Sequence, residues 1–521
     1  MTLRRFLCAL LSAALLSAGW LGMSGLPLLA ALVPLLWISD SCGASRRGWW
    51  CMFGWACLTF VSWNGATIWG LWYATPVGPF AATLASTFLN LLAFMLYHTV
   101  SKRAHRALAY TLLVSGWIAT EYWYTVGEFS FPWLLLGNGF AVDTWAVQWY
   151  EYTGLFGGSL WVLVCNLLLF EAWRHRRSVR HWVRAGLAVA IPPAVSLAIY
   201  FGWQEPQRTI EAAVVQPDVD CYDKFSTSPE LQHGNLLSLL AEVPDSVRLI
   251  AMPETALVEG INESCIESSP TLARFEEALA AGHPQALLVV GADTYKIYPE
   301  GVRTSTARLR NGIWYDRFNT ALAVQASGVG AIHHKSRLVI GVEKMPLPWL
   351  FEWLRFLVVD LGGTTGQLGV DRQRTVFTAG DVAVAPAICY ESVYGAYMGE
   401  FVQRGAQLFV VITNDGWWGD TAIHRQHFSF SRLRAIEHRR AVVRSANTGI
   451  SGFITARGDV VAPTLGWNER GVLTQTVAVA DGMTFYTRYG DYVGRIAEYV
   501  LLLCLLYYVA YRVKRRSHLV D

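Results

Sequence analysis

Three reactive side chains follow short apolar runs in the second half of this 521-residue chain. Cys389 ends "VAVAPAIC", Glu254 follows "LIAMP", and Lys335 lies in "AIHHKSRLV". A thiol, a carboxylate that can take its proton and an ammonium that can hold an oxyanion form a complete set for acyl transfer without a metal. Free cysteine is, however, among the most commonly buried residue types. The surroundings of Cys389 alone therefore leave open whether it is a core residue or a displayed nucleophile.

These side chains require a scaffold that brings strand ends together. Between residues 204 and 492 the hydropathy falls, and short β-rich runs alternate with amphipathic runs, which predicts an α/β or α+β domain. The predicted strands are 211–219, 248–257, 286–293, 320–328, 382–390 and 407–415, and the predicted helices are 230–241, 271–282, 393–404 and 424–440. Strand ends are where α/β folds concentrate ligand and catalytic groups.

The composition excludes an ordinary soluble enzyme. The chain is 53% hydrophobic, contains 23 tryptophans and has a formal net charge of only +3, which is too small to indicate nucleic-acid binding. Most apolar stretches approach the roughly 20 residues that cross a bilayer. The second stretch is short and could be re-entrant or tilted. About eight crossings are predicted, at 6–23, 28–38, 49–73, 79–100, 108–125, 155–173, 185–203 and 493–511.

Basic residues alternate with the apolar stretches. They lie before the first stretch, after the second and fourth, around the turn between the sixth and seventh, and in the C-terminal tail. The alternate connections, 24–27, 74–78 and 126–154, contain no Lys or Arg. Because cytoplasmic loops carry an excess of Lys and Arg, both termini are predicted to be cytoplasmic and residues 204–492 to lie outside the cytoplasm. The first stretch also fits a cleaved signal peptide, but further membrane stretches follow it at once.

These patterns divide the chain into three expected parts. Residues 1–203 form a membrane domain of about seven helices, 204–492 form the extracytoplasmic domain, and 493–521 form a last crossing with a basic cytoplasmic tail. The aromatic segment 128–152 is expected at the outer membrane interface. There, Trp133 and Trp145 either help to form a lipid entrance or only anchor adjacent helices.

Several other polar clusters do not predict a site of their own. "HRQH" (424–427) and the pair His333 and His334 lack the further ligands of a recognised zinc motif, so no metal site is expected. The arginines of 432–444 are expected on a helical segment, in salt bridges rather than bound to nucleic acid. No Walker or dinucleotide glycine motif is present in the sequence.

Cysteine usage offers one further hypothesis. Only Cys221, Cys265 and Cys389 fall in the extracytoplasmic part, where thiols can be oxidised. An odd count fits one free reactive thiol beside a bridge between Cys221 and Cys265.

Five segments together carry a family resemblance. They are "MPETAL", "HKSRLVIGVEKMP", "AICYES", "ITNDGWWGD" and "RQHFSFSRLRAIEHRRAVVRSANTGISG", and they span most of 211–480. With the flanking apolar stretches, they resemble the bacterial apolipoprotein N-acyltransferase family, a membrane-embedded branch of the nitrilase superfamily. The resemblance implies about eight crossings plus one periplasmic nitrilase-like domain with an αββα sandwich fold.

The resemblance also implies a role for each reactive residue. Cys389 would be the nucleophile, Glu254 the proton acceptor and Lys335 the group that stabilises the oxyanion. Glu343 matches a further glutamate that the family needs, and it follows Lys335 by eight positions. The loop before Glu343 reads "LVIGVE" where the better-known pattern is Leu-Val-Pro-Phe-Gly-Glu, which leaves the conformation of this loop open.

Four more residues are matched to the family in the same way. Tyr390 and Glu391 match the residues that follow its nucleophile and are expected to support the site. Phe225 in "CYDKF" stands where many relatives have a tryptophan beside the substrate entrance. Trp417 in "ITNDGWWGD" is the second residue expected to bind substrate.

The implied reaction has two steps. An acyl chain would pass from a phospholipid to Cys389 as a thioester, and then to the α-amino group of an apolipoprotein's N-terminal diacylglyceryl-cysteine. Phospholipid and apolipoprotein would be the partners of a monomer in the bacterial inner membrane, with no cofactor, no metal and no nucleic acid. One alternative is a membrane-anchored nitrilase-type amidohydrolase, in which water resolves the acyl-enzyme. A transporter or sensor whose outer domain only binds is a third possibility, although its expected intramembrane charges are few here.

Overall fold

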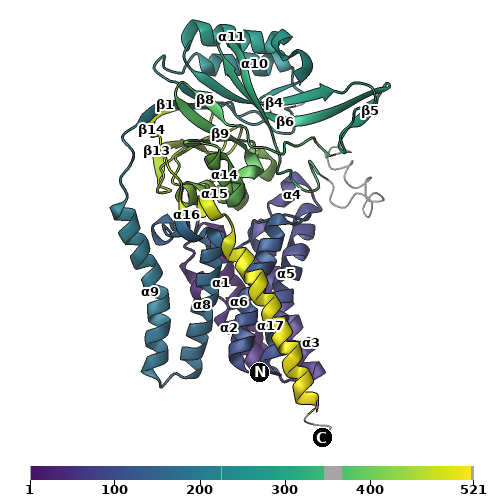
Figure 1. Ribbon diagram of the computed structural model, residues 1–521, viewed down its shortest axis with the longest axis vertical. Helices are drawn as coiled ribbons and strands as arrows, with labels where there is room; N and C mark the ends of the chain where they lie inside the picture. The colour runs from purple at the N-terminus through teal and green to yellow at the C-terminus, as the bar shows by residue number, and fades with distance from the viewer. Residues whose placement is uncertain (1, 225, 345–366, 518–521) are drawn as a thin grey trace. The chain divides into compact units, whose positions relative to one another are not determined.

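The computed structural model describes residues 2–224, 226–344 and 367–517 (Figure 1). Within this range the chain forms two compact units. One unit, here called the helical unit, comprises Met1–Trp72, Val77–Gly202 and Tyr489–Asp521. The other, here called the sheet unit, comprises Tyr73–Pro76 and Trp203–Arg488. Each unit has its own architecture.

All eight predicted apolar stretches are helical. The helices are α1 (Thr2–Ser17), α2 (Val33–Ser41), α3 (Arg46–Ile68), α5 (Gly78–Ser101), α6 (Arg106–Val126), α8 (Leu155–Arg174), α9 (Val179–Gly202) and α17 (Tyr492–Ser517), as Figure 1 shows. In the described part of the chain, five helical segments are long and apolar enough to cross a membrane: Thr2–Leu21, Gly78–Ser101, Leu155–Arg174, Val179–Gly202 and Tyr492–Arg515. The helical unit therefore contains several helices with the length and composition of membrane spans.

The short second stretch is an interrupted helix. It consists of the 3-10 turn η2 (Leu26–Ala30) followed by α2, and prolines lie at the start of both pieces. Asn166 of α8 repairs the break, because its amide donates to the carbonyl of Leu28 at 2.7 Å and accepts from the N–H of Leu32 at 2.6 Å. An irregular backbone at membrane depth requires such partners, since lipid cannot supply hydrogen bonds.

The aromatic segment 128–152 is folded into the helical unit. It forms the short turns η3 (Leu136–Phe140), η4 (Thr144–Ala146) and α7 (Tyr150–Thr153). Trp133 is only 2% exposed and stacks on Phe131 at 5.9 Å, whereas Trp145 is 39% exposed. The ring of Trp133 therefore packs inside the unit, and the choice between a lipid entrance and a helix anchor stays a prediction. Trp145 retains an exposed surface.

Two β-sheets form the centre of the sheet unit. The first has the order β14 (Gly471–Ala478), β1 (Thr209–Gln216), β2 (Leu249–Ala251), β4 (Leu287–Ile297), β6 (Ile313–Gln325) and β5 (Arg308–Arg310), while β3 (Leu257–Asn262) pairs with β4 and β7 (Gly328–His334) with β6. The second has the order β13 (Val460–Leu465), β12 (Ser451–Ile454), β11 (Val442–Ala446), β10 (Leu408–Thr413), β9 (Val382–Ile388) and β8 (Phe377–Ala379). In the second sheet β9, β10 and β11 are parallel.

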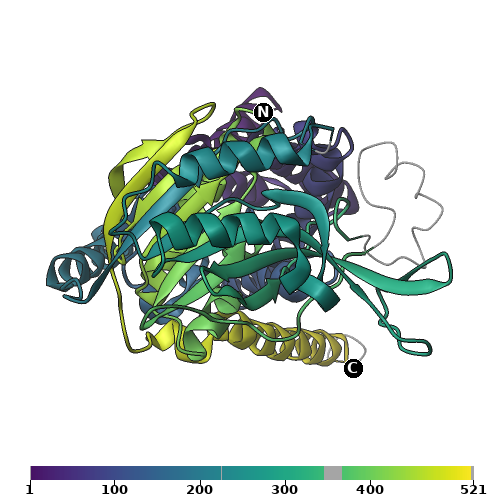
Figure 2. The same ribbon diagram turned by 90° about the horizontal axis from the view of Figure 1, so that it is seen from above.

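Helices cover the outer faces of both sheets. The helices α10 (Pro229–Leu240) and α11 (Pro270–Gly282) run side by side over the first sheet (Figure 2). Leu236 and Phe275 of these helices share one apolar core with Ile250 and Leu288 of the strands. The second sheet is covered by α14 (Gly395–Gln403) and α15 (Ala422–His438), and β1 and β6 of the first sheet contact β11 and β9 of the second. The order of layers is helix, sheet, sheet, helix.

Two predicted elements differ from the observed ones. The strand expected at 248–257 is split into β2 and β3, and Glu254 lies in the turn between them. The helical segment expected to carry the arginines of 432–444 ends at His438, where Arg439 adopts a left-handed conformation with φ of 50°. Arg444 instead lies on β11, because the β-branched run "VV" at 442–443 pairs with β10 inside the sheet.

Candidate active site

Turns at three strand ends bring the predicted triad together. Glu254 lies three residues after β2, and Lys335 and Cys389 directly follow β7 and β9. The Nζ of Lys335 donates to Oε1 of Glu254 at 2.9 Å, although the two residues are 81 positions apart. Because β2 and β7 belong to one sheet and β9 to the other, the site forms where the ends of the two facing sheets meet.

Cys389 occupies a strained turn between β9 and the 3-10 turn η7 (Cys389–Val393). Its φ is 49°, a left-handed conformation that costs energy for any residue with a side chain. The hydroxyl of Ser392 donates to the Cys389 carbonyl at 2.7 Å and fixes the turn. Cys389 is only 5% exposed. The prediction that this cysteine is displayed rather than buried is therefore wrong about burial, because every residue of η7 is buried inside the sheet unit.

The charges of the triad depend on one another. Burial raises the pKa of the Cys389 thiol well above its ordinary value, and the Glu254 carboxylate adds to the rise. Burial also favours neutral Glu254, but the charge and hydrogen bond of Lys335 outweigh it and hold the pKa of this carboxyl below its ordinary value. Burial opposes the charge on Lys335, yet Glu254 and Glu343 raise its pKa well above the ordinary range. At rest the site holds a thiol, a carboxylate and an ammonium, so the thiol must lose its proton as it attacks.

Glu343 lies on the other side of the same ammonium. Its Oε1 accepts from Lys335 Nζ at 2.9 Å, and its Oε2 accepts from the backbone N–H of Val339 at 2.8 Å. Gly341 makes this loop possible with a φ of 85°, a region that suits glycine. The altered loop sequence thus still delivers the carboxylate. Asn319, which the sequence did not single out, donates to Glu254 at 2.7 Å and to Glu343 at 3.1 Å and so holds both acids.

Glu391 is fully buried and holds two turns in place. Its carboxylate accepts from the backbone N–H groups of Ile388 at 2.9 Å and Ser336 at 2.7 Å. It also pairs with His333 at 3.1 Å and accepts from the Tyr397 hydroxyl. Because Ile388 precedes the cysteine and Ser336 follows the lysine, Glu391 fixes the distance between the turns of Cys389 and Lys335.

Three predicted residues remain: Tyr390, Trp417 and Phe225. Tyr390 is buried, and its ring meets that of Tyr394 edge to face at 5.3 Å. Trp417 is half-buried in η8 (Asp415–Trp418), and its ring lies 5.7 Å from that of Tyr222. Phe225 lies outside the described residues. The assignment of Trp417 to substrate binding stays a prediction.

Lys224 is a second buried lysine beside the site that sequence reasoning missed. It is 2% exposed, and its Nζ donates to the backbone carbonyl of Glu254 at 2.9 Å. Burial lowers the pKa of Lys224 to about 8, against the attraction of Glu254. Nothing in "CYDKF" separates this lysine from a surface charge, because its burial depends on contact with the turn after β2.

A buried cluster of three ionisable residues lies behind the nucleophile. Arg444 donates to Asp415 at 2.7 Å, Asp415 lies 2.9 Å from Nδ1 of His427, and Nε2 of His427 lies 3.2 Å from the Cys389 carbonyl oxygen. The three residues and Cys389 come from four different elements: Cys389 from η7, Asp415 from η8, His427 from α15 and Arg444 from β11. The pKa of Asp415 is held well below its ordinary value, because the charges of Arg444 and His427 outweigh the effect of burial. The cluster was missed because Arg444 was placed on a helix.

The same residues bear on the question of a metal. Ligand atoms of Cys389, Asp415 and His427 lie within 4.8 Å of one another, a grouping that could hold an ion. Arg444 already provides positive charge there, with Nη2 2.7 Å from Asp415 and 2.9 Å from Nδ1 of His427. This arrangement favours an ion pair over a metal, since a cation would have to share its ligands with a guanidinium. His334 is engaged by Glu263 and Asp371.

We expect Asp415→Asn to slow acylation of Cys389 without removing any reacting atom. The substitution leaves the Arg444 guanidinium buried without its carboxylate and loosens His427, so the cysteine turn shifts. A displacement of this kind lowers a rate by about a hundredfold. The measurement is the single-turnover rate of acyl-enzyme formation, with Asp420→Asn as control. Asp420 is an exposed acid on the same segment, and equal rates in the two variants would contradict a positioning role.

The two cysteines of the proposed bridge are both free thiols. Cys221 is buried and Cys265 is exposed. The bridge hypothesis is therefore wrong for this structure, since one thiol lies inside the sheet unit and the other on its surface.

Comparisons with known proteins agree with this architecture. Residues 211–484 match the model of the carbon-nitrogen hydrolase family, and residues 10–168 match that of the apolipoprotein N-acyltransferase N-terminal domain. An apolipoprotein N-acyltransferase of Chlorobaculum tepidum is 30% identical over 82% of this chain and 82% of its own. That of Rhodopseudomonas palustris is 24% identical over 96% of this chain and 95% of its own.

Among solved structures, a CN-hydrolase superfamily protein of Xanthomonas campestris has a TM-score of 0.35 at 16% identity, covering 52% of this chain and 91% of its own. The family assignment does not depend on this likeness. It follows from the two family models, which cover both halves of the chain, and from relatives that align along most of their length. The resemblance noted from the five sequence segments is thereby confirmed, and the chain belongs to the apolipoprotein N-acyltransferase family.

Proposed function

We propose that this protein transfers an acyl chain from a membrane phospholipid, through a thioester on Cys389, to the α-amino group of the N-terminal diacylglyceryl-cysteine of apolipoproteins. The observation that carries this function is the family-specific helical domain at 10–168 on the same chain as the carbon-nitrogen hydrolase domain. A hydrolase domain alone would fit an amidohydrolase equally well. A membrane domain fits a reaction in which both substrates are lipids.

The first step makes the acyl-enzyme. Cys389 Sγ attacks the ester carbonyl of the phospholipid, and its proton passes to the Glu254 carboxylate. The tetrahedral oxyanion is stabilised by the Lys335 ammonium, which is held in place by two carboxylates at 2.9 Å each. The carbon–oxygen bond of the ester then breaks, Glu254 returns the proton to the leaving oxygen, and a lysophospholipid departs.

The second step regenerates the enzyme. The neutral α-amine of the acceptor attacks the thioester carbonyl, a carbon–nitrogen bond forms and the carbon–sulfur bond breaks. Glu254 accepts the proton that the amine loses and returns it to the Cys389 thiolate. The raised pKa of this thiol favours its reprotonation, so the cysteine is ready for the next ester.

Glu343 has a supporting role in both steps. It shares the Lys335 ammonium with Glu254 at equal distance, and so directs one proton donor of that group away from the reacting carboxylate. Tyr390 and Glu391 support the turn that bears the nucleophile, and Phe225 and Trp417 are proposed to bind substrate.

The function is tested by the product formed in detergent from purified protein, phospholipid and a synthetic diacylglyceryl-cysteine peptide. We expect the peptide to gain the mass of one acyl chain, as an amide that resists hydroxylamine. Release of free fatty acid with an unmodified peptide would identify the amidohydrolase instead. A third outcome, an unchanged phospholipid with folded protein, would reject both reactions.

We also propose the arrangement in the membrane. The chain crosses the inner membrane about eight times, with 1–203 and 493–521 forming the membrane parts and both termini in the cytoplasm. Residues 204–492 form the periplasmic domain, and the protein acts as a monomer. The alternating distribution of basic residues supports this orientation.

Cys265 offers a direct test of this orientation because it is an exposed thiol in η5 (Glu263–Ser268). We expect a membrane-impermeant maleimide to label the protein in intact spheroplasts, and Cys265→Ser to remove most of that label. Labelling of Cys265 only after the membrane is permeabilised would place the sheet unit in the cytoplasm and overturn the proposed orientation.

A further inference from the structure

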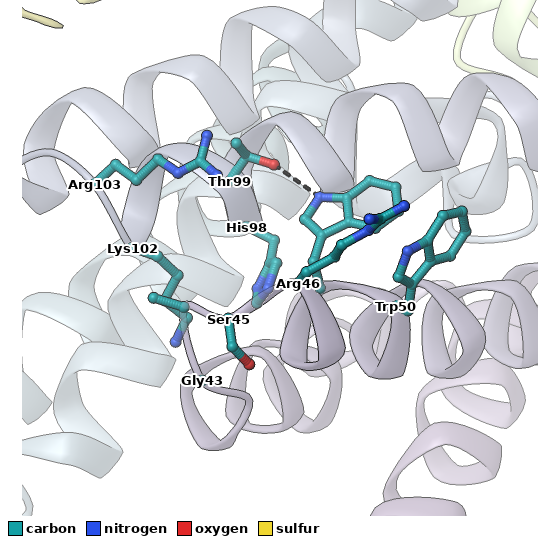
Figure 3. A pocket seen from close by; sticks show the side chains of 10 residues that line it. Gly43, Ser45, Arg46, Trp50, His98, Thr99, Lys102 and Arg103 are labelled. Carbon is teal, nitrogen blue, oxygen red and sulfur yellow. Dashed lines mark hydrogen bonds between the residues drawn. The ribbon is translucent and has the colours of Figure 1, made fainter.

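The helical unit contains a cavity that the proposed reaction does not use. The cavity has a volume of about 440 Å³ and lies where α3 begins and α5 ends. Its walls carry three basic side chains, Arg46 from α3 and Lys102 and Arg103 from the end of α5, as well as two indole rings, those of Trp49 and Trp50. Figure 3 shows the basic side chains of both helices around one hollow, with His98 and Ser45 between them. We call this group the basic pocket.

The positive charge of the basic pocket is not neutralised by the protein. Within the part of the chain that the structure describes, no carboxylate pairs with Arg46, Lys102 or Arg103. The nearby Asp40 carboxylate is engaged by Arg106 at 3.3 Å and Arg174 at 3.1 Å. Lys102 donates to the backbone carbonyl of Asp40 at 3.2 Å, and the Asp40 carboxylate attracts it without forming an ion pair. Three cations in one cavity repel each other unless an anion joins them.

The start of α3 adds to the same preference. Ser45 caps the helix by accepting from the N–H of Gly48 at 3.1 Å, and Arg46 is the first helical residue. The first turn of a 23-residue helix therefore borders the cavity together with the basic side chains. The N-terminal end of a helix carries partial positive charge, which favours an anion there.

The aromatic side chains indicate where the cavity lies in the bilayer. Trp49 is half-buried and donates to the Thr99 hydroxyl at 3.1 Å, which ties α3 to α5 (Figure 3). Trp50 is 54% exposed and lies near the start of α3. Tryptophan is enriched at the level of the lipid head groups, because one side of its ring is apolar and the other polar. A ligand of the basic pocket would therefore meet cationic groups and apolar rings at once.

We propose that the basic pocket binds the phosphate group of an anionic phospholipid from the leaflet at this end of the helices. Phosphate matches the guanidinium and ammonium groups, and the glycerol and acyl chains match the exposed indole. The ligand is distinct from the acyl donor, because every lining residue belongs to the helical unit and none to the triad. The inference does not depend on the proposed reaction. The bound lipid would regulate or anchor the protein through residues that the proposed reaction does not use.

The test is lipid binding to the full-length protein, measured by native mass spectrometry in detergent with dioleoyl phosphatidylglycerol. We expect Arg46→Gln/Arg103→Gln to weaken binding about 25-fold, since each lost cation near a membrane surface contributes on the order of a fivefold change in affinity. The matched control is Arg177→Gln/Arg180→Gln, which removes two exposed arginines, one from the turn between α8 and α9 and one from the start of α9. We expect this control to bind as wild type does.

Three further outcomes decide the inference. Equal loss in pocket and control variants would show that only net charge matters, and would overturn it. Displacement of the lipid by submillimolar inorganic phosphate would confirm a phosphate site and reject the lipid as its source. Binding of dioleoyl phosphatidylcholine as tight as that of phosphatidylglycerol would overturn the preference for an anionic lipid. Amide formation at the wild-type rate by the pocket variant would show that this variant is folded. If the double variant does not fold, Lys102→Gln replaces it in the binding experiment, with about a fivefold loss of affinity expected.

Discussion

Cys389→Ser is expected to abolish the acyl-enzyme while the protein remains folded. The substitution exchanges sulfur for oxygen in a buried turn and changes the side-chain volume little, so packing is kept. A hydroxyl is a far weaker acid than a thiol, and Glu254, whose pKa lies below its ordinary value, is too weak a base to take its proton. Loss of a nucleophile in a comparable hydrolytic site lowers the rate by about a million-fold.

The measurement is intact-protein mass spectrometry after incubation with phospholipid and no acceptor. Wild type should gain one acyl chain that hydroxylamine removes, and Cys389→Ser should gain none. Cys221→Ser is the matched control, because Cys221 is also a buried thiol of the sheet unit. An adduct that persists in Cys389→Ser and disappears in Cys221→Ser would show that Cys221 is the nucleophile and would contradict the role of Cys389.

Lys335→Met is expected to remove acyl-enzyme formation for two linked reasons. The tetrahedral oxyanion loses its cation, and a single lost donor of this kind lowers a rate by about 100- to 1000-fold. The carboxylates of Glu254 and Glu343 also lose the ammonium that lies 2.9 Å from each. Without that cation, the neighbouring Glu343 carboxylate raises the pKa of the buried Glu254, so Glu254 would be protonated at a pH where wild type has it charged.

The pH dependence separates these two causes. In wild type the pKa of Glu254 is below its ordinary value, so the carboxylate is ready as a base throughout the neutral range. In Lys335→Met the same pKa should lie above its ordinary value, and the residual rate should therefore rise with pH across a range where wild type is flat. The measurement is the rate of acyl-enzyme formation between about pH 6 and 9, a range that lies above the ordinary pKa of a glutamate, about 4.3.

Glu343→Gln supplies the contrast for this experiment. It removes one carboxylate and leaves Lys335 paired with Glu254, so we expect a smaller loss than that of Lys335→Met. The double variant Lys335→Met/Glu343→Gln should fold better than Lys335→Met, because the buried Glu254 then has no second uncompensated carboxylate beside it. Wild-type thioester formation in Lys335→Met would refute the role of Lys335 outright.

Much of the site could be predicted because local patterns carry it. Glu254, Lys335 and Cys389 each follow a short apolar run, and strand ends in α/β folds collect reactive groups. The apolar stretches predicted helices, and all eight are helical. Local patterns do not predict how deeply the end of a strand is buried. The sequence therefore predicts an accessible Cys389, although this residue is 5% exposed.

The residues that were missed depend on contacts between distant parts of the chain. Arg444 pairs with Asp415 because β10 and β11 are neighbours in parallel register and α15 ends at His438, before Arg444. The sequence around Lys224 is that of a surface lysine, and only its contact with the turn after β2 makes it buried. The aromatic segment around Trp133 is typical of a membrane interface, whereas the structure buries the Trp133 ring inside the helical unit.

The amino-acid sequence by itself predicted the helical stretches and the strand ends that carry the proposed triad, because these follow from residue type and from periodicities of two and 3.6 residues. The resemblance of five segments to a known family implied the acyl-transfer chemistry. Only the tertiary structure decided the burial of Cys389, the position of Lys335 between Glu254 and Glu343, and the cluster behind the nucleophile. Each of these depends on two sheets packing face to face, and that packing brings together residues far apart in the chain. The backbone N–H of Asn414 donates to Glu254, 160 positions away, and the hydroxyl of Ser445 donates to the Val215 carbonyl, 230 positions away. Local sequence does not encode such distances.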